Sequence, residues 1–161
     1  MELILFRHGE KQALGSDPEL TSVGKSQAVS IADLVKSRSL PRPTQIYVSP
    51  RKRAVQSLQP LADAANLKPK ITPDLDQQVS AESGKDFRLR VQEFMVKSAL
   101  DWKSTDVVYL CSHQDWIMEF LSVIECDTDL LQGIYVHWDT AAFMHFEKRE
   151  LWHLVKFGRA R

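Results

Sequence analysis

Three apolar-rich runs predict the strands at the centre of the fold. Residues 3–6 lead directly into Arg7-His8-Gly9, and similar runs cover residues 45–48 and 106–111. A continuous apolar run closed by a glycine turn, as at residues 3–9, is typical of a buried parallel strand. A further short strand is predicted at residues 70–71. The pattern therefore favours a parallel sheet that is covered on both faces.

Between these runs, apolar residues recur at helical spacing. Helices are predicted from residue 21 or 22 to about residue 37, from residue 51 onward, from 82 to 102 and from 116 to 124. Thr21 or Ser22 is a natural N-cap for the first helix. Its apolar face comprises Ala28, Ile31, Ala32, Leu34 and Val35, and the buried side of the third helix is predicted to comprise Phe87, Val91, Phe94, Met95 and Leu100.

The end of the chain has a different pattern. Two apolar-rich segments, 141–146 and 151–156, flank a charged stretch at 147–150 and predict a terminal hairpin. Because helices and strands alternate before that hairpin, the predicted fold is a three-layer α/β/α sandwich with a mostly parallel central sheet. The hairpin would form an antiparallel edge. No repeat, low-complexity tract or linker divides the chain, so residues 1–161 are predicted to form one domain.

Composition limits the classes of partner. The 161 residues include 21 basic and 21 acidic side chains, and this balance provides no overall basic field that would attract nucleic acid or anionic lipid. No apolar run approaches the roughly 20 residues that a membrane helix needs. No basic stretch precedes the first strand, and two cysteines are too few for a disulfide scaffold. These features predict a cytoplasmic location.

Cationic and imidazole side chains follow the predicted strands. Parallel strands separated by helices would bring Arg7, His8, Arg53 and His113 to one rim of the sheet. Three cations at 51–53 also open the second helix, where the helix dipole favours anions by ~0.3–1 kcal/mol. Guanidinium groups repel cations and do not coordinate metals, whereas they match phosphate oxygens well. The rim is therefore predicted to bind a phosphoryl group without a metal.

Five segments, taken in order, resemble the histidine phosphatase superfamily, which is also called phosphoglycerate mutase-like. Arg7-His8-Gly9 matches the family's defining tripeptide. Residues 17–28 resemble its Asp-x-x-Leu-Thr-x-x-Gly-x-x-Gln-Ala segment, and residues 49–57 resemble Ser-Pro-x-x-Arg-Ala-x-Gln-Thr. Ser112-His113 resembles the second family histidine. Glu82-Ser83 together with Arg90-Val91 resembles a family helix start.

The resemblance implies a mechanism without cofactors. His8 would be the nucleophile that forms a phosphohistidine intermediate, which water then hydrolyses. Arg7, Arg53 and His113 would bind the phosphoryl group, with Arg51 as a further candidate at the rim. A neutral His8 ring must be held in orientation by its other nitrogen, and the backbone carbonyl of Gly9 is the candidate acceptor.

One segment departs from the family pattern. Many members carry a glutamate, as general acid, at the third position of a Leu-x-Glu segment, where this chain reads Leu75-Asp76-Gln77. An amide cannot donate a proton to an alkoxide. The sequence leaves open whether Asp76, Asp115, Glu82, Glu10 or no residue replaces the acid. Asp115, two residues after His113, is taken as the candidate catalytic acid, and the alternative is that Asp76 and Asp115 are loop and helix-cap residues.

The missing glutamate bears on the substrate. Positioned acid catalysis contributes about 10²–10⁴ in rate for leaving groups that need a proton. A phosphoramidate has a labile P–N bond, and the short, lidless members of the family that hydrolyse phosphohistidine also lack this glutamate. A phosphohistidine protein is therefore the leading substrate hypothesis. The alternatives are a phosphorylated small molecule, a phosphomutase reaction, and a non-catalytic phosphate-binding module of the same fold.

Three further histidines invite a metal-site interpretation. His137, His145 and His153 are spaced by eight residues and share strand parity. The charged stretch at 147–150 reverses the chain between the last two, so surface or half-buried strand histidines are favoured over metal ligands. The four tryptophans are interpreted as packing residues, because zero net charge argues against a nucleic-acid stacking platform.

Overall fold

A computed structural model describes residues 1–161 and contains one six-stranded sheet with the strand order β3-β2-β4-β1-β5-β6. The strands are β1 (Glu2–Arg7), β2 (Gln45–Val48), β3 (Lys70–Ile71), β4 (Val107–Ser112), β5 (Ala142–Lys148) and β6 (Trp152–Arg159). The first four strands run parallel, and the β5–β6 hairpin adds antiparallel strands beside β1. The predicted fold class is confirmed, including its antiparallel edge.

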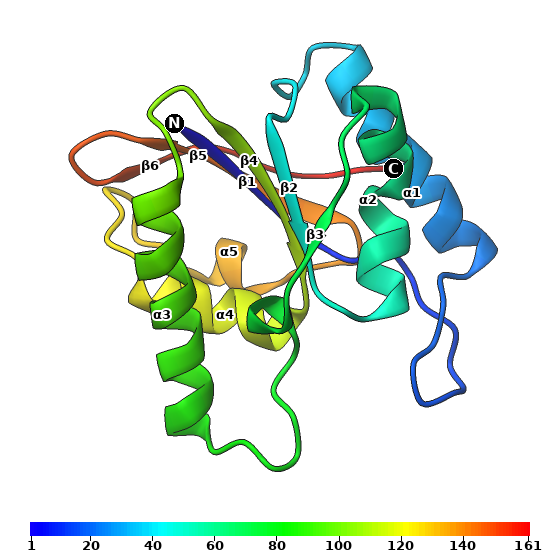
Figure 1. Cartoon of the computed structure of the whole chain (residues 1–161), viewed down its shortest axis with the longest axis horizontal. Coiled ribbons are helices and arrows are strands. Elements are labelled where there is room, and N and C mark those ends of the chain that lie inside the picture. Colours follow the sequence, from blue (N-terminus) through cyan, green and yellow to red (C-terminus); the bar gives the residue numbers. More distant parts are fainter.

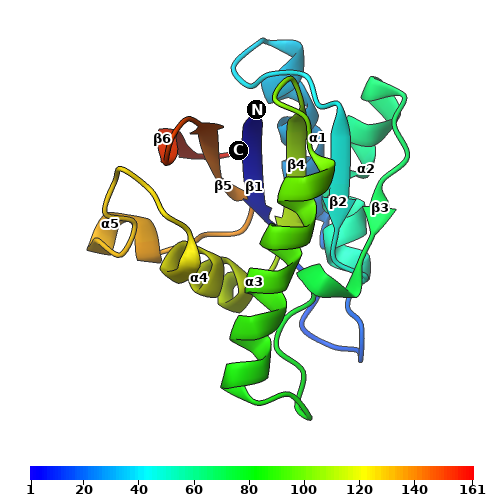
Figure 2. The same ribbon diagram turned by 60° about the vertical axis from the view of Figure 1, so that its left-hand side comes forward.

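Helices cover both faces of the sheet (Figures 1 and 2). α1 (Ser22–Lys36) and α2 (Lys52–Ala65) lie on one face, while α3 (Gly84–Asp101), α4 (Gln114–Val123) and the short α5 (Gly133–Val136) lie on the other. A single 3₁₀ turn, η1 (Pro73–Leu75), follows β3. No helix is both long and apolar enough to cross a membrane.

The apolar run in β1 is explained by this double cover. Leu3 and Leu5 pack in the core beneath α3 and α4, whereas Ile4 and Phe6 pack in the core beneath α1 and α2. Successive side chains of a strand point to opposite faces, so a strand between two helical layers needs an apolar residue at every position. All four side chains are fully buried, and β1 is fixed as a central strand with its carboxyl end at the site.

Two helix predictions need correction. Leu100, which was expected on the buried side of α3, is 84% exposed. The buried line of that helix runs through Phe87, Val91, Phe94 and Ser98, and Leu100 lies about 200° past Ser98 around the axis, facing solvent. α4 begins at Gln114 rather than near Trp116, since His113 is its N-cap residue. α5 was not predicted.

A close backbone approach joins α1 to the turn after β1. A Cβ atom at Gly24 would lie 2.1 Å from the backbone oxygen of Glu10, so only glycine fits there. The backbone N–H of Glu10 donates to Gln27 Oε1 at 2.8 Å, and Thr21 caps the helix by accepting from the N–H of Gly24 at 3.0 Å. The Thr-x-x-Gly-x-x-Gln pattern thus holds the first turn of α1 against the segment that follows His8.

Candidate active site

The sheet register brings the predicted residues to one edge. Arg7 lies beside Ser112 in the β1–β4 pair, and Val48 lies beside Cys111 in the β2–β4 pair. The next residues along these strands are held by backbone hydrogen bonds from His8 to Ser112 and from Ser49 to Cys111, at 3.1 and 3.0 Å. The carboxyl ends of β1, β2 and β4 are therefore level and adjacent.

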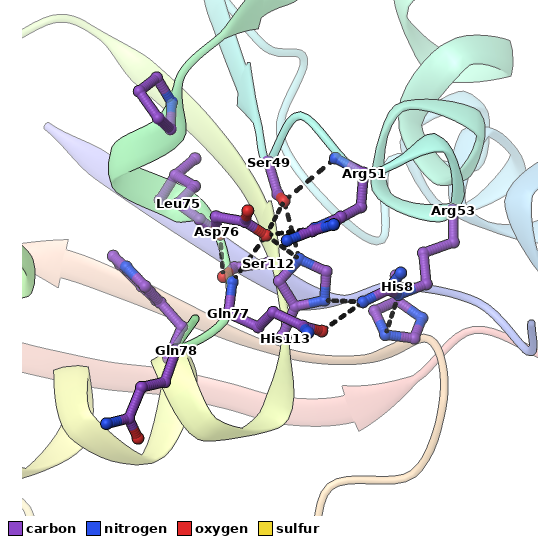
Figure 3. Close-up of polar contacts among 12 residues, drawn as sticks. His8, Ser49, Arg51, Arg53, Leu75, Asp76, Gln77, Gln78, Ser112 and His113 are labelled. Atoms are coloured by element: carbon purple, nitrogen blue, oxygen red, sulfur yellow. Dashed lines mark hydrogen bonds and ion pairs between the residues drawn. The ribbon is translucent and has the colours of Figure 1, made fainter. Parts of the chain in front are cut away.

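Arg53 joins the two histidines of this edge (Figure 3). Its Nε donates to His8 Nε2 at 3.2 Å, and its Nη2 donates to His113 Nδ1 at 3.1 Å. The imidazole ring centroids are 5.1 Å apart, and all three residues are at most 5% exposed. One guanidinium from the first turn of α2 thus contacts both rings, which come from positions 105 residues apart in the sequence.

These contacts fix where each ring carries its proton. A guanidinium only donates, so the nitrogen that faces Arg53 must present a lone pair. In His8 the proton then lies on Nδ1, which donates to the carbonyl of Gly9 at 2.7 Å, the acceptor that the sequence predicted. In His113 it lies on Nε2, which is 2.7 Å from Ser49 Oγ. Both free lone pairs point toward the same guanidinium.

An open pocket of about 540 Å³ lies over this cluster. It is lined by Arg7, His8, Lys11, Arg53, Gln77, His113, Gln114, Asp115 and Met118. Arg7 donates through Nη1 to the carbonyl of Trp138, and its Nε is buried without a hydrogen-bond partner. Arg7, Lys11 and Arg53 give the pocket lining three cationic side chains, which suits an oxyanion.

Burial and neighbouring cations keep both rings neutral. Loss of solvation, reinforced by Arg53 and Arg7, lowers the pKa of His8 to about 4 even though its hydrogen bond to Gly9 acts in the opposite direction. Loss of solvation, followed by His8 and the arginines, lowers the pKa of His113 to about 2. At neutral pH, His8 therefore has an unprotonated Nε2, the form a nucleophile requires.

These shifts predict acid sensitivity. A histidine in the unfolded chain has a pKa near 6.5. Below that pH the unfolded chain therefore binds protons that the folded protein does not bind, and the free energy of unfolding falls as the pH drops from about 6.5 toward 4. At pH 5 each ring costs about 2 kcal/mol relative to pH 7.5. Urea unfolding at both pH values should show that loss, and His113→Gln should reduce it. An equal reduction in the control His153→Gln, at the exposed hairpin, would contradict the assignment.

The acid candidates separate in space. Asp115 lines the pocket, and its carboxylate accepts from the backbone N–H groups of Gln78 and Trp116, at 2.8 Å each. Glu82 is paired with Arg90 through two contacts of 2.8 Å, and Glu10 accepts from Thr21 Oγ1 at 2.7 Å. Neither glutamate lines the pocket. Asp115 alone among the four carboxylates does.

Asp76 occupies a different place from Asp115. It lies behind His113, and its Oδ1 accepts from Arg51 Nε at 2.8 Å. Arg51 is thereby directed to this carboxylate and is absent from the pocket lining. Gln77, at the position of the family acid, enters the pocket and accepts from Arg53 Nη2 at 2.5 Å.

Sequence reasoning overlooked three contributors. Ser49 contacts His113, Ser57 Oγ accepts from the N–H of Gly9 at 2.8 Å, and the carbonyl of Trp138 accepts from Arg7. Ser49 follows a predicted strand directly, so the same argument that identified Arg7-His8 applied to it. Ser57 is the last residue of the segment 49–57 that resembles the family pattern, so that segment offered a signal for it. No local signal marks Trp138, which reaches the site through a contact between distant segments.

Two of the three remaining histidines, His145 and His153, have partners of their own. His145 Nε2 is 2.6 Å from Glu2 Oε2, and His153 Nδ1 is 2.7 Å from Asp127 Oδ2. No group of three or more histidine, cysteine or acidic residues is arranged to hold a metal ion. Cys111 is buried and Cys126 partly buried, and both thiols are free.

The chain was compared with protein-family models, with curated proteins and with solved structures, and the first and last of these comparisons gave matches. Residues 3–79 match the family model described as the histidine phosphatase superfamily (branch 1). Comparison with curated proteins gives no match. Many solved structures match over nearly the whole chain, and the family resemblance noted from the motifs is confirmed.

Three of these structures illustrate the likeness. A putative α-ribazole-5′-P phosphatase from Escherichia coli K-12 aligns with a TM-score of 0.79 at 18% identity over 99% of this chain and 97% of that one. A phosphoserine phosphatase from Entamoeba histolytica, in complex with 3-phosphoglyceric acid, aligns with a TM-score of 0.75 at 17% identity, over 99% and 98%. The protein histidine phosphatase SixA, complexed with tungstate, aligns with a TM-score of 0.73 at 18% identity, over 99% and 97%.

Proposed function

We propose, on the premise that this chain has the histidine phosphatase fold and matches that superfamily's model over residues 3–79, that it is a phosphatase acting through a phosphohistidine intermediate. The observation that carries the proposal is the pair of neutral histidines bridged by the buried Arg53. His8 presents an unprotonated Nε2 to an open pocket that the cationic side chains of Arg7, Lys11 and Arg53 also line.

The proposed reaction has two steps. His8 Nε2 attacks phosphorus in line with the leaving group, and the bond to the leaving atom breaks as the P–N bond forms. Arg7, Arg53 and His113 bind the equatorial oxygens, where negative charge is concentrated in the transition state. Water then attacks the phosphohistidine and releases phosphate. The guanidinium groups supply the positive charge, so the reaction is proposed to need no metal.

A protein-borne phosphohistidine is the proposed substrate class. Gln77 lies where the family acid would lie and contacts Arg53, and an amide has no proton to give an alkoxide. An imidazole leaving group is protonated readily by solvent, so it depends little on a positioned acid. The pocket is also open, and the loops at 8–21 and 76–83 lie at the lower edge of the molecule (Figure 1).

A small phosphate ester is the second candidate. The observation in its favour is Asp115, whose carboxylate lines the pocket beside His113 and is the candidate proton donor. Solved structures with this fold include a phosphoserine phosphatase. A phosphomutase and a non-catalytic phosphate-binding module of the same fold are weaker alternatives.

Three substrates distinguish these possibilities: a phosphohistidine peptide, an alkyl phosphate and an aryl phosphate, each assayed with a metal chelator. The expected result is turnover of the peptide and of the aryl phosphate, whose leaving group needs no acid, with Asp115→Asn changing the peptide rate by less than about threefold. Efficient alkyl phosphate hydrolysis that is lost in Asp115→Asn would instead establish the ester phosphatase. Binding of phosphate without any turnover would establish the binding module.

A further inference from the structure

A buried polar chain runs behind His113, on the side away from His8. His113 Nε2 is 2.7 Å from Ser49 Oγ, and the Ser49 hydroxyl is 3.4 Å from Asp76 Oδ1. The same carboxylate oxygen is 3.6 Å from His113 Nε2 itself. Ser49 is fully buried, and the side chain of Asp76 is 13% exposed. Figure 3 shows these side chains meeting between β2, β4 and the segment after η1.

Donor and acceptor roles along this chain are determined. Nδ1 of His113 faces a guanidinium nitrogen, so the ring proton lies on Nε2 and donates to Ser49 Oγ. Ser49 also accepts from the backbone N–H of Arg51 at 3.3 Å, which leaves its own proton for the Asp76 carboxylate. Asp76 Oδ1 accepts from Arg51 Nε at 2.8 Å and from the N–H of Gln77 at 2.9 Å. Every Asp76 Oδ1 contact therefore fits an ionised carboxylate.

The charge around His113 changes when an oxyanion enters the pocket. Charged side chains of both signs surround the ring. The cations are Arg7 from β1 and Arg51 and Arg53 from the start of α2, and the acids are Asp76 after η1 and Asp115 from α4. His8 is a further titratable neighbour of the ring. These surroundings favour the neutral ring. A phosphoryl group adds up to two negative charges on the Nδ1 side and reverses that balance.

We propose that Asp76 is a positioning residue for phosphoryl transfer: through Ser49 it fixes the tautomer of His113, and it stabilises the protonated ring that binds the phosphoryl oxygen through Nδ1. The inference rests on the proposed function for its catalytic part. The added proton comes from solvent or from a phosphate monoanion and goes to Nδ1. The hydrogen bond that Nδ1 accepts from Arg53 is then replaced by one that Nδ1 donates to the phosphoryl oxygen, while Nε2 keeps its bond to Ser49. Asp76 thus acts from behind the ring and is not the acid that protonates the leaving group.

Arg51 tunes this arrangement by pairing with the same oxygen of Asp76. The hydrogen bond to Asp76 raises the pKa of Arg51 further, so its guanidinium stays charged at any working pH. Arg51 therefore offsets part of the electrostatic attraction between the Asp76 carboxylate and a protonated His113. Residue 77 is a glutamine where many family members have the acidic glutamate. Asp76 is the residue just before it, and we assign it the positioning role and not that of the acid.

The test combines three variants with two measurements. Asp76→Asn removes the charge and keeps the shape, Ser49→Ala breaks the link, and Asp74→Asn is the control, because the Asp74 side chain contacts only Thr72. Turnover of an aryl phosphate should fall about 10–100-fold in Asp76→Asn and Ser49→Ala, mainly in kcat, and stay within twofold in Asp74→Asn. Asp76→Glu should recover part of the loss.

Ring-labelled histidine NMR provides the readout that a merely structural role would not change. With inorganic phosphate bound near pH 7, His113 should be protonated at both nitrogens in the wild type and at only one in a folded Asp76→Asn variant. Equal protonation in the two proteins, or kcat of Asp76→Asn within twofold of wild type, would overturn the inference. If the wild-type protein shows no turnover but His113 still takes up a proton when phosphate binds, the proposed function is rejected and the role of Asp76 is not.

Discussion

Replacing His8 by alanine is expected to reduce turnover of an aryl phosphate by about 10⁴-fold or more and to abolish covalent phosphate on the protein. The size of the effect follows from the site, because His8 Nε2 is the unprotonated imidazole nitrogen at which the P–N bond would form. Acid-quenched wild-type protein incubated with phosphohistidine peptide should carry acid-labile phosphate. The His8→Ala protein should carry none.

The control for that variant is a histidine outside the pocket. His153 pairs with Asp127 on the β5–β6 hairpin, so His153→Ala should retain at least half of the wild-type rate and should trap phosphate normally. Trapped phosphate in His8→Ala would show that another residue is the nucleophile. Comparable rates for wild type and His8→Ala would remove covalent catalysis from the mechanism.

Arg53→Met is expected to have the second-largest effect, a loss of about 10²–10³-fold in kcat/KM, or roughly 3–4 kcal/mol of transition-state stabilisation. The guanidinium donates to both histidines and to Gln77, so its removal takes away the positive charge at the centre of the pocket. Steady-state kinetics with an aryl phosphate measures the loss.

Two further consequences distinguish Arg53 from a purely structural residue. Its charge lowers the pKa of both His8 and His113, so histidine NMR titration of Arg53→Met should place both pKa values above those of the wild type. The free energy of unfolding should fall little, because burying a cation among other cations gives little net stability. Arg42→Met, which removes an exposed arginine that donates to the carbonyl of Ala65, is the control. Unchanged histidine pKa values would refute the electrostatic role.

The helical layers show where pattern reasoning succeeds and where it fails. Apolar-rich runs located β1, β2 and β4, since a strand covered on both faces is apolar along most of its length, whereas β3 is an exposed edge strand of two residues. The same reasoning misplaced Leu100, because a leucine in the last turn of α3 fits the helical period loosely and only packing against Trp102 and the sheet decides which side is buried. α5 is a four-residue turn and has no periodicity to detect.

The site shows the same division. A run that ends in Arg7-His8, another that ends in Ser49-Pro50 and a third that ends in Ser112-His113 sufficed to place two arginines and two histidines at one rim, because parallel strands share a carboxyl edge. The positions of Asp76 and Asp115 could not be derived in that way. Both follow loops or strand ends in the sequence, and only the paths of the segments after η1 and β4 put one behind His113 and the other on the pocket wall.

The sequence by itself determined the order of the main elements, the central strands and the four residues that meet at one edge of the sheet, since these depend on local periodicity and on the shared direction of parallel strands. The tertiary structure alone decided which nitrogen of each histidine is free, which carboxylate faces the pocket and why Gly24 can have no side chain. Those properties depend on contacts between segments that are distant along the chain, and no local pattern of residues encodes a distance across the fold.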